Sequence, residues 1–446
     1  MIELLLQSPQ IEQFLPGLLE EGREGCVVLL TRAVARDKVA HRLLAWDFVI
    51  PDSDAYIRRG SLEAQLSHDL VARITKRAKS EGCGLVFVHS HPGDEPPQFS
   101  SIDDEGEKHL ATFLRQRIPN STHIALVISS GGMAARILGT EESIRVTEVG
   151  VRHRILYDAS NSENSRAVTS AHDRQVRAFG AAGQQRLNQL TVGIVGLGGT
   201  GSVVAQQLAH LGVRRFLLID PDTVEVTNLN RLANASPSDV GQPKTDVAKR
   251  YIQSVSPEAD VQAVVGDVTR VSIARRLANV DILFGCTDSH GSRAVIQQIA
   301  YQYLVPCIDM GSTIIASNGR ITHIHGRVQM LTPGMPCLTC SQLLNTNEVR
   351  RDMMTEFERK SDPYIVGARE PAPAVMSLNA TVASLAVTML LNTVTEMGGN
   401  ARHLLYNAMS SSLRSIAPTA QKNCFICSNA GVLARGDDNP LMARQD

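Results

Sequence analysis

The stretch Leu190–Arg231, LTVGIVGLGGTGSVVAQQLAHLGVRRFLLIDPDTVEVTNLNR, sets the architecture of the larger part of this chain. Its apolar run Thr191–Val195 predicts a buried parallel strand, and a helical pattern follows at Ser202–Leu211. Between the two stand the glycines Gly196, Gly198, Gly199 and Gly201. Glycine allows a tight turn and lets a phosphate approach the helix N-terminus, whose free N–H groups favour anions. We therefore expect a nucleotide to bind across this unit.

A second predicted strand, Arg215–Ile219, ends in Asp220, close to the spacing at which a carboxylate meets a ribose hydroxyl. The glycine pattern alone does not identify the nucleotide, because Gly196, Gly198 and Gly201 also satisfy the dinucleotide fingerprint. An NAD-dependent oxidoreductase is therefore one alternative, and a glycine turn that binds no ligand is another.

Polar residues beyond the second strand favour ATP over NAD. They are Asn228, Asn230 and Arg231, then Lys244 in GQPK, and Asp288 in CTDSHGSR after the predicted strand Asp281–Cys286. Lysine and arginine offset triphosphate charge and an aspartate binds Mg²⁺, whereas a hydride-transfer cofactor requires no such cluster. Asp288 by itself is also explained as a helix cap. Beside Lys244 and Arg231 it favours Mg-ATP.

The series GLGGTG, LLIDPDTVEVTNLNRL, GQPK, CTDSHGSR and two CxxC pairs resembles the ubiquitin-activating superfamily, in its MoeB, ThiF and HesA branch, over about residues 172–430. The resemblance implies that Asp220 binds the ribose, that Asn228, Asn230, Arg231 and Lys244 surround the phosphates, and that Asp288 holds magnesium. It also implies that Arg174, in HDRQVRAFG, reaches as an arginine finger into the partner subunit's site. A homodimer through the C-terminal domain follows from that role.

Four of the eight cysteines form two CxxC pairs, Cys337–Cys340 and Cys424–Cys427. Two such pairs supply the closed tetrahedral set of four thiolates that structural zinc prefers, with a redox pair as the alternative. Ubiquitin-activating enzymes and ThiF pass the activated carboxylate to a cysteine, generally in the crossover loop after the first CxxC. Here that loop, Ser341–Pro373, contains no cysteine. We therefore expect release of the acyl-adenylate to an external nucleophile, as in MoeB-like members.

A second chemical motif, VFVHSHPGDEPPQFSSIDDEGE, lies in the N-terminal part of the chain. His89 and His91 flank one residue at a predicted strand end, so their side chains project to the same face, and Asp103 lies where the next helix begins. Two histidines and a carboxylate leave a fourth position for water, which is typical of catalytic zinc. A general base must then accept the proton of that water, and Glu24, before the strand CVVLL, is the candidate.

The order of glutamate, HSHP and SSxD resembles the JAMM (JAB/MPN) metalloproteases, which cut ubiquitin-like proteins from their attachments. The resemblance implies zinc on His89, His91 and Asp103, a proton shuttle at Glu24, and a role for Ser100 in holding the oxyanion. Alternatives stay open at two places. Asp104 follows Asp103 directly as a possible third ligand, and Glu20 and Glu21 also precede the strand. A metal-free surface turn is the structural alternative for the whole motif.

The length of 446 residues predicts two or three domains, and the two resemblances imply α/β folds. We expect a JAB/MPN-like α/β domain at residues 1–150, a polar linker at 151–171, and a Rossmann-like ThiF-type domain with a mostly parallel sheet at 172–446. Lys plus Arg (44) nearly equal Asp plus Glu (45), so no global field attracts nucleic acid or an anionic membrane. The N-terminus lacks the features of a signal peptide, and the apolar run Ala374–Val394 contains several polar residues, so we interpret it as a core helix of a cytosolic protein.

The sequence predicts two opposed activities. The C-terminal domain is expected to adenylate the C-terminal carboxylate of a small ubiquitin-like or sulfur-carrier protein with Mg-ATP, and the N-terminal domain to hydrolyse an amide at that same terminus. An adenylating enzyme of a peptide-antibiotic or cofactor pathway is the alternative function. A metal-free recognition module is the alternative for the first domain.

Overall fold

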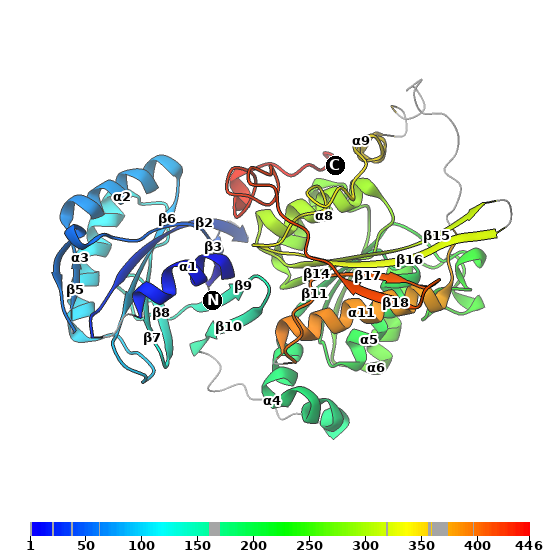
Figure 1. Ribbon diagram of the computed structural model, residues 1–446, viewed down its shortest axis with the longest axis horizontal. Coiled ribbons are helices and arrows are strands. Elements are labelled where there is room, and N and C mark those ends of the chain that lie inside the picture. Colours follow the sequence, from blue (N-terminus) through cyan, green and yellow to red (C-terminus); the bar gives the residue numbers. More distant parts are fainter. Residues whose placement is uncertain are drawn as a thin grey trace. The chain divides into compact units, whose positions relative to one another are not determined.

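The computed structural model describes residues 2–19, 22–36, 39–61, 63–159, 170–317, 320–355, 358, 373–395 and 397–446. The chain divides into two compact units, each with its own eight-stranded sheet (Figure 1). Unit 1 comprises Met1–Ser165, Gln302–Leu304 and Val432–Pro440, and unit 2 comprises Arg166–Tyr301, Val305–Gly431 and Leu441–Asp446. Most of the predicted linker, residues 160–169, lies outside the described residues, as do the alternative bases Glu20 and Glu21.

Unit 1 is a mixed sheet with the strand order β10-β9-β1-β3-β2-β6-β7-β8. Its strands are β1 (Glu3–Gln7), β2 (Cys26–Arg36), β3 (Val39–Val49), β6 (Gly84–Ser90), β7 (Ile124–Ser129), β8 (Gly132–Ile137), β9 (Arg145–Val149) and β10 (His153–Tyr157). The helices are α1 (Ser8–Leu18), α2 (His68–Glu81) and α3 (Ser101–Arg117), and a separate ribbon pairs β4 (Tyr56–Arg59) with β5 (Ala64–Leu66). The central strands β2, β6 and β7 are rich in Val, Leu and Ile that are almost fully buried, so they anchor the loops at their ends.

The sequence pattern of unit 1 predicts four strands, at 26–30, 43–50, 85–89 and 124–129, and one helix from Leu62 to Lys79. The helix prediction is wrong at its beginning. Residues Ala64–Leu66 pair with β4, and α2 starts only at His68. The Ser67 hydroxyl accepts the Leu70 N–H and caps the helix, a local signal that the apolar periodicity alone did not reveal. The strands predicted at 26–30, 43–50, 85–89 and 124–129 are confirmed, although β2 and β3 run further than expected.

Unit 2 has the strand order β13-β12-β11-β14-β15-β16-β17-β18, parallel from β13 to β15 and antiparallel beyond. Its strands are β11 (Thr191–Val195), β12 (Arg215–Asp220), β13 (Asp260–Val265), β14 (Ile282–Gly285), β15 (Cys307–Ser317), β16 (Arg320–Leu331), β17 (His403–Asn407) and β18 (Ser412–Ser415). Its helices are α4 (Asp173–Gln189), α5 (Gly199–His210), α6 (Lys244–Val255), α7 (Val271–Ala274), α8 (His290–Gln302), α9 (Thr346–Met353) and α11 (Met376–Val394). The parallel half brings the loops after β11, β12, β13 and β14 to one edge of the sheet.

The apolar run near residue 380 forms helix α11, which packs on α5, β15 and β16. By length and composition alone α11 is apolar enough to cross a membrane, but 56% of its most apolar window is buried inside the unit. Val382, Ala383 and Leu390 are fully buried in the same core as β11 and β14. This packing supports the interpretation of α11 as a core helix.

Candidate active sites

The predicted zinc ligands of unit 1 lie together at the end of β6. The two Nε2 atoms of His89 and His91 are 3.2 Å apart, and Asp103 Oδ1 lies 3.1 Å from His89 Nε2. His89 and His91 face the same side because they alternate with Ser90 on one strand, while Asp103 comes from the first turn of α3.

The spacing of these atoms fits a tetrahedral metal. With zinc–nitrogen bonds near 2.0–2.1 Å, two ligand atoms of a tetrahedron lie about 3.3 Å apart. One donor atom from each of the three residues lies within 4.8 Å of the others. Burial, followed by the neighbouring His89, lowers the pKa of His91 and favours the neutral imidazole that binds metals. Burial opposes ionisation of Asp103, but hydrogen bonds from His89 and Ser100 outweigh it and lower the pKa of that carboxyl. A neutral His91 and an ionised Asp103 are the protonation states that zinc requires of these two donors.

Asp103 and Asp104 are separated by their partners. Ser100 caps α3, because its hydroxyl accepts the Asp103 N–H and donates to Asp103 Oδ2 at 2.8 Å. Asp104 instead pairs with Arg136 at 2.6 Å, away from the histidines. The structure thus brings Asp103 to the histidine pair, and it shows Ser100 orienting that carboxylate.

Glu24 lies on the other side of the histidine pair, with Oε1 4.0 Å from His91 Nε2. The residue is 6% exposed, and burial raises the pKa of its carboxyl, as expected of a group that must take up a proton. Two contacts that the sequence did not reveal fix its backbone. Ser90 Oγ accepts the Gly25 N–H at 2.8 Å, and Arg59 Nε donates to the Glu24 carbonyl at 2.9 Å.

A cavity of about 280 Å³ opens beside this cluster. Its lining includes His91, Pro92 and Gly93 from the loop after β6, and Leu18 and Arg23 from the segment before Glu24. A metal held by the histidines would therefore be reached from a cleft large enough for a few peptide residues.

The glycine turn of unit 2 joins β11 to α5, which begins at Gly199, three residues before the predicted helix start. Gly196 has a φ of +88°, a conformation that other residues rarely adopt. A Cβ on Gly201 would lie 1.9 Å from the Gly196 carbonyl oxygen, and one on Gly199 would lie 2.2 Å from Asn379. The turn therefore has no space for side chains at Gly199 and Gly201, which is typical of a phosphate-binding turn. The N-terminus of α5 lies at this turn.

Asp220 ends β12 beside this turn and is 4% exposed. Its carboxylate accepts the Leu197 N–H at 2.6 Å and the Asp222 N–H at 2.8 Å. Burial raises the pKa of Asp220, and the nearby Lys244 acts in the opposite direction. The structure thus places the Asp220 carboxylate beside the glycine turn.

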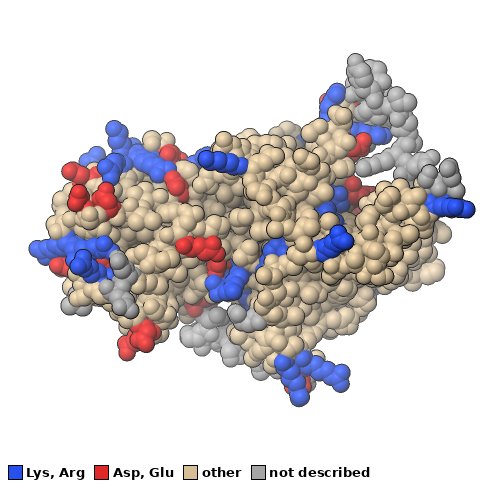
Figure 2. Space-filling model, viewed as in Figure 1, with Lys and Arg blue, Asp and Glu red and all other residues tan. Residues whose placement is uncertain are grey.

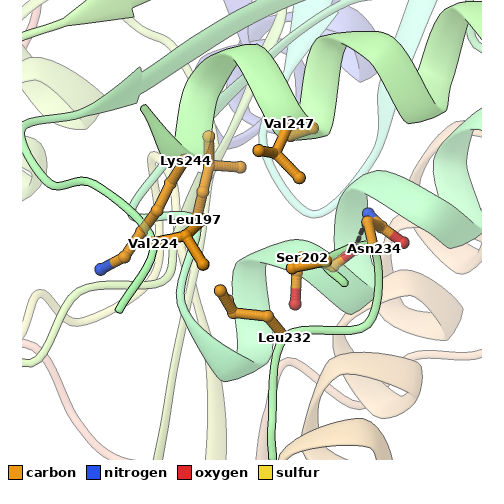
Figure 3. Close-up of a pocket in the computed structure, with 9 residues that line it drawn as sticks. Leu197, Ser202, Val224, Leu232, Asn234, Lys244 and Val247 are labelled. Carbon is orange, nitrogen blue, oxygen red and sulfur yellow. Dashed lines mark hydrogen bonds between the residues drawn. The ribbon is translucent and has the colours of Figure 1, made fainter. Parts of the chain in front are cut away.

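Lys244 begins α6 and pairs with Asp222, their N–O distance being 2.7 Å. Sequence reasoning missed Asp222, whose carboxylate pairs with the Lys244 ammonium. Figure 3 shows Lys244 with Leu197, Ser202 and Asn234 around a cavity of about 10 Å³, the volume of a single water. Such a cavity is too small for a nucleotide.

The other predicted phosphate ligands follow β12 in one loop. Asn228 is buried and its Oδ1 accepts the Glu225 N–H, so its side chain shapes a local turn. Asn230 is exposed, and Arg231 Nη1 donates to the Thr227 carbonyl at 2.6 Å. Ser202 of α5 anchors this loop by accepting the Ala233 N–H. The structure thus joins this loop to α5, the helix that follows the glycine turn.

Asp288 and Arg174 are both exposed. Asp288 lies between β14 and α8, one strand beyond the glycine turn in the sheet. Arg174 is in the first turn of α4, and no described contact of its side chain joins it to the nucleotide loops of its own chain. Within the described residues, the edge of the sheet thus gathers the glycines, Asp220, Lys244 and Asp288.

The four CxxC cysteines form a second candidate metal site. Cys337 Sγ lies 3.6 Å from Cys424 Sγ, and Cys340 Sγ lies 3.6 Å from Cys427 Sγ. A tetrahedron of sulfurs with zinc bonds near 2.3 Å has edges of about 3.8 Å, so these distances fit. Hydrogen bonding from Cys427, and to a smaller extent from backbone, lowers the pKa of Cys337 to about 5, which favours a thiolate. No open position remains, so this site is structural.

We predict two zinc ions per chain. His91→Ala should remove one ion and leave thermal stability nearly unchanged, whereas Cys424→Ser should remove the other and lower the free energy of unfolding of unit 2 by several kcal/mol. Metal analysis and thermal melts of both variants check this. A Cys424→Ser protein that keeps two zinc ions and the wild-type Tm would contradict the assignment.

The two units together define a fused protein in which a JAB-type hydrolase fold precedes a Rossmann-like nucleotide-binding fold. The profile of the ThiF family matches residues 172–427, and that of the prokaryotic homologs of the JAB domain matches residues 17–138. The chain therefore belongs to the ThiF family and carries a JAB domain ahead of the ThiF domain.

Among known proteins, the chain is similar to activating enzymes and to an adenylyltransferase. It is 29% identical to ubiquitin-like modifier-activating enzyme 5 of Oryza sativa subsp. japonica, over 56% of this chain and 58% of that protein. It is 25% identical to the SAMP-activating enzyme E1 of Haloferax volcanii (57% and 86% covered) and 27% identical to the molybdopterin-synthase adenylyltransferase of Escherichia coli K12 (57% and 95%). The chain thus spans little more than half the length of the rice protein. Among solved structures, E. coli MccB with MccA-N7isoASN matches with 20% identity and a TM-score of 0.47, over 58% of this chain and 76% of that one.

Proposed function

We propose that unit 2 uses Mg-ATP to adenylate the C-terminal carboxylate of a small ubiquitin-like or sulfur-carrier protein, releasing pyrophosphate. One observation carries the proposal: the glycine turn, Asp220, Lys244 and Asp288 gather at one edge of a ThiF-family sheet. The names of the relatives from Haloferax volcanii and E. coli support this class of substrate. An NAD-dependent oxidoreductase is disfavoured because it would need neither Lys244 nor Asp288.

In this reaction the chain positions the reactants and neutralises charge. The α5 N-terminus and Lys244 bind the phosphates, with Lys244 exchanging Asp222 for a phosphate oxygen, while Asp220 orients the ribose. Asp288 would hold Mg²⁺, which supplies charge neutralisation at the phosphates. The carboxylate oxygen attacks the α-phosphorus, the bond to the β-phosphate oxygen breaks, and pyrophosphate leaves.

The adenylate passes to an external nucleophile in this proposal. Two facts support the absence of an internal thiol acceptor. The crossover loop 341–373 contains no cysteine. Burial raises the pKa values of Cys286 and Cys307 far above the ordinary range, so neither forms a thiolate readily.

For unit 1 we propose zinc-dependent hydrolysis of the amide at the same partner's C-terminus, either to expose its carboxylate or to remove it from a conjugate. His89, His91 and Asp103 would hold zinc, which supplies Lewis acidity and a bound water of lowered pKa. Glu24 then takes up the proton of the attacking water and transfers it to the leaving amine. Ser100 keeps Asp103 oriented, and its oxyanion role stays a proposal from the resemblance. A partner that is a short peptide of an antibiotic or cofactor pathway is the alternative.

We propose that both reactions take place in the cytosol, without nucleic acid or membrane. On the face that Figure 2 shows, basic and acidic side chains lie in scattered groups of both signs, with uncharged residues between them. This charge distribution favours a protein partner over a polyanion.

The test of the adenylation proposal is exchange of labelled pyrophosphate into ATP. We expect exchange only when a small protein with a free C-terminal Gly-Gly is present, because the adenylate forms reversibly. Small proteins that end in Gly-Gly and are encoded beside this chain would be the first ones to test. NADH binding together with absent exchange would contradict the proposal.

The proposed arginine finger predicts complementation between two inactive variants. In a homodimer, Arg174→Ala fails to supply the finger and Asp288→Ala fails to bind magnesium, so each homodimer is inactive. After subunit exchange at equal amounts, half of the dimers are mixed and each has one complete site, which gives about a quarter of the wild-type activity. Absence of any recovery in dimers that exchange subunits would show that Arg174 does not act across the interface.

A further inference from the structure

Residues 441–446 contact the carboxyl edge of the unit 2 sheet. The proposed adenylation reaction assigns these residues no role. The backbone of Arg444 lies along residues 269–271, with its N–H donating to the Thr269 carbonyl at 2.6 Å and its carbonyl accepting the Val271 N–H at 2.9 Å. The segment is fixed further along by Gln298 of α8, whose Oε1 accepts the Met442 N–H at 2.6 Å. It is therefore an ordered part of unit 2.

The Arg444 guanidinium joins three points of this edge. It pairs with Asp267, donates to Thr269 Oγ1 at 2.7 Å, and donates to the Met354 carbonyl at 3.3 Å. Asp267 and Thr269 belong to the loop after β13, and Met354 directly follows α9. A planar guanidinium suits this fixed set of acceptors better than a lysine ammonium would.

Helix α9 is held at a second point, next to Asp288. Asp352 Oδ2 accepts the Ser289 hydroxyl at 2.8 Å and the Gly291 N–H at 3.0 Å. The contacts of Asp352 thus connect α9 to the segment beside Asp288, the proposed magnesium ligand. The contacts of Arg444 connect the end of α9 to the loop after β13.

The order of the strands indicates which part of the nucleotide meets that loop. The phosphates belong at the glycine turn after β11, and the ribose at Asp220 after β12. The next strand in the same direction is β13, whose following residue Gly266 donates its N–H to the Asp220 carbonyl at 3.2 Å. A nucleotide that runs from phosphate to ribose along this edge places its base against the loop 266–269.

We propose that Arg444 is a positioning residue for the base end of the bound nucleotide, because it fixes the loop 266–269 against α9. The inference rests on the proposed use of ATP by unit 2. Asp267 Oδ1 already accepts the Thr269 N–H at 2.8 Å, so the arginine completes a loop whose shape depends on the Asp267 carboxylate. Without Arg444, the base would meet a loop that samples several conformations. Ordering the loop would then require free energy, and the affinity for the nucleotide would fall.

The experiment measures binding of ATP and of inorganic tripolyphosphate to the full chain and its variants. Arg444→Ala should weaken ATP binding about tenfold, the effect of one charged hydrogen bond, and leave tripolyphosphate binding unchanged because that probe has no base. Arg444→Lys should lie between the wild type and Arg444→Ala. Arg414→Ala, an exposed arginine of β18 at the opposite edge of the sheet, should match the wild type.

A second arm separates positioning from misfolding. Asp267→Asn should reproduce the Arg444→Ala effect, and the double variant should be no worse than either single one. Amide exchange in residues 346–353 should speed up in Arg444→Ala while zinc content stays at the wild-type value. Wild-type ATP affinity in Arg444→Ala, or an equal loss for ATP and tripolyphosphate, overturns the inference. A wild type that binds ATP but adenylates no partner contradicts the proposed function alone.

Discussion

Replacing Asp288 by alanine should lower partner-dependent pyrophosphate exchange by about two to three orders of magnitude, since a magnesium ion at the phosphates supplies several kcal/mol of charge stabilisation. The side chain is exposed and lies in the loop between β14 and α8, so its loss leaves the core of unit 2 intact. Exchange rates at saturating ATP, measured over a range of magnesium concentrations, check the prediction.

Asp260→Ala is the matched control for that variant. Asp260 is also an exposed aspartate of the same sheet, but it begins β13 and so lies at the opposite, amino-terminal edge of the parallel strands. The control should exchange at the wild-type rate. If Asp288→Ala and Asp260→Ala behave alike, Asp288 has no part in the chemistry and its role is that of a helix cap.

Glu24→Gln should lower amide hydrolysis by about 10²–10⁴-fold, the usual contribution of a general base. The substrate for this measurement is a ubiquitin-like protein extended beyond its terminal Gly-Gly. Glutamine keeps the size of the buried side chain, and Arg59 and Ser90 still hold the backbone of residues 24 and 25, so zinc content should stay at the wild-type value.

The control for Glu24→Gln is Glu95→Gln, an exposed glutamate in the loop that follows the two histidines. It should cleave at the wild-type rate. Unchanged cleavage in Glu24→Gln would support the alternative that unit 1 is a recognition module, whereas loss of zinc from that variant would show that Glu24 binds the metal.

The sequence predicted those parts of both sites that depend on short local patterns. Such patterns are the glycine turn, the HSHP strand end and the two CxxC pairs. The structure brings the side chains of the histidines and of the cysteines together, and it packs the backbone of the glycine turn closely. Asp220 and Asp288 were found because parallel strands bring their following residues to one edge.

Contacts between distant segments could not be predicted in the same way. Arg59, Asp222 and Asp352 each support a functional group from a different element, and nothing in the residues around them indicates that partner. The same holds for Arg444, which lies 177 residues from Asp267. Asn228 has a local role that its type and spacing did not reveal, because its Oδ1 accepts the Glu225 N–H.

The central claim is that this chain uses ATP to activate the terminal carboxylate of another polypeptide without an internal thiol acceptor. The most direct measurement is mass spectrometry of the full chain incubated with Mg-ATP and a small protein that has a free C-terminal Gly-Gly. We predict a partner that gains one AMP on its C-terminal carboxylate, and a chain whose own mass does not change. A thioester on Cys286 or Cys307, or AMP that never becomes linked to a carboxylate, would contradict the account.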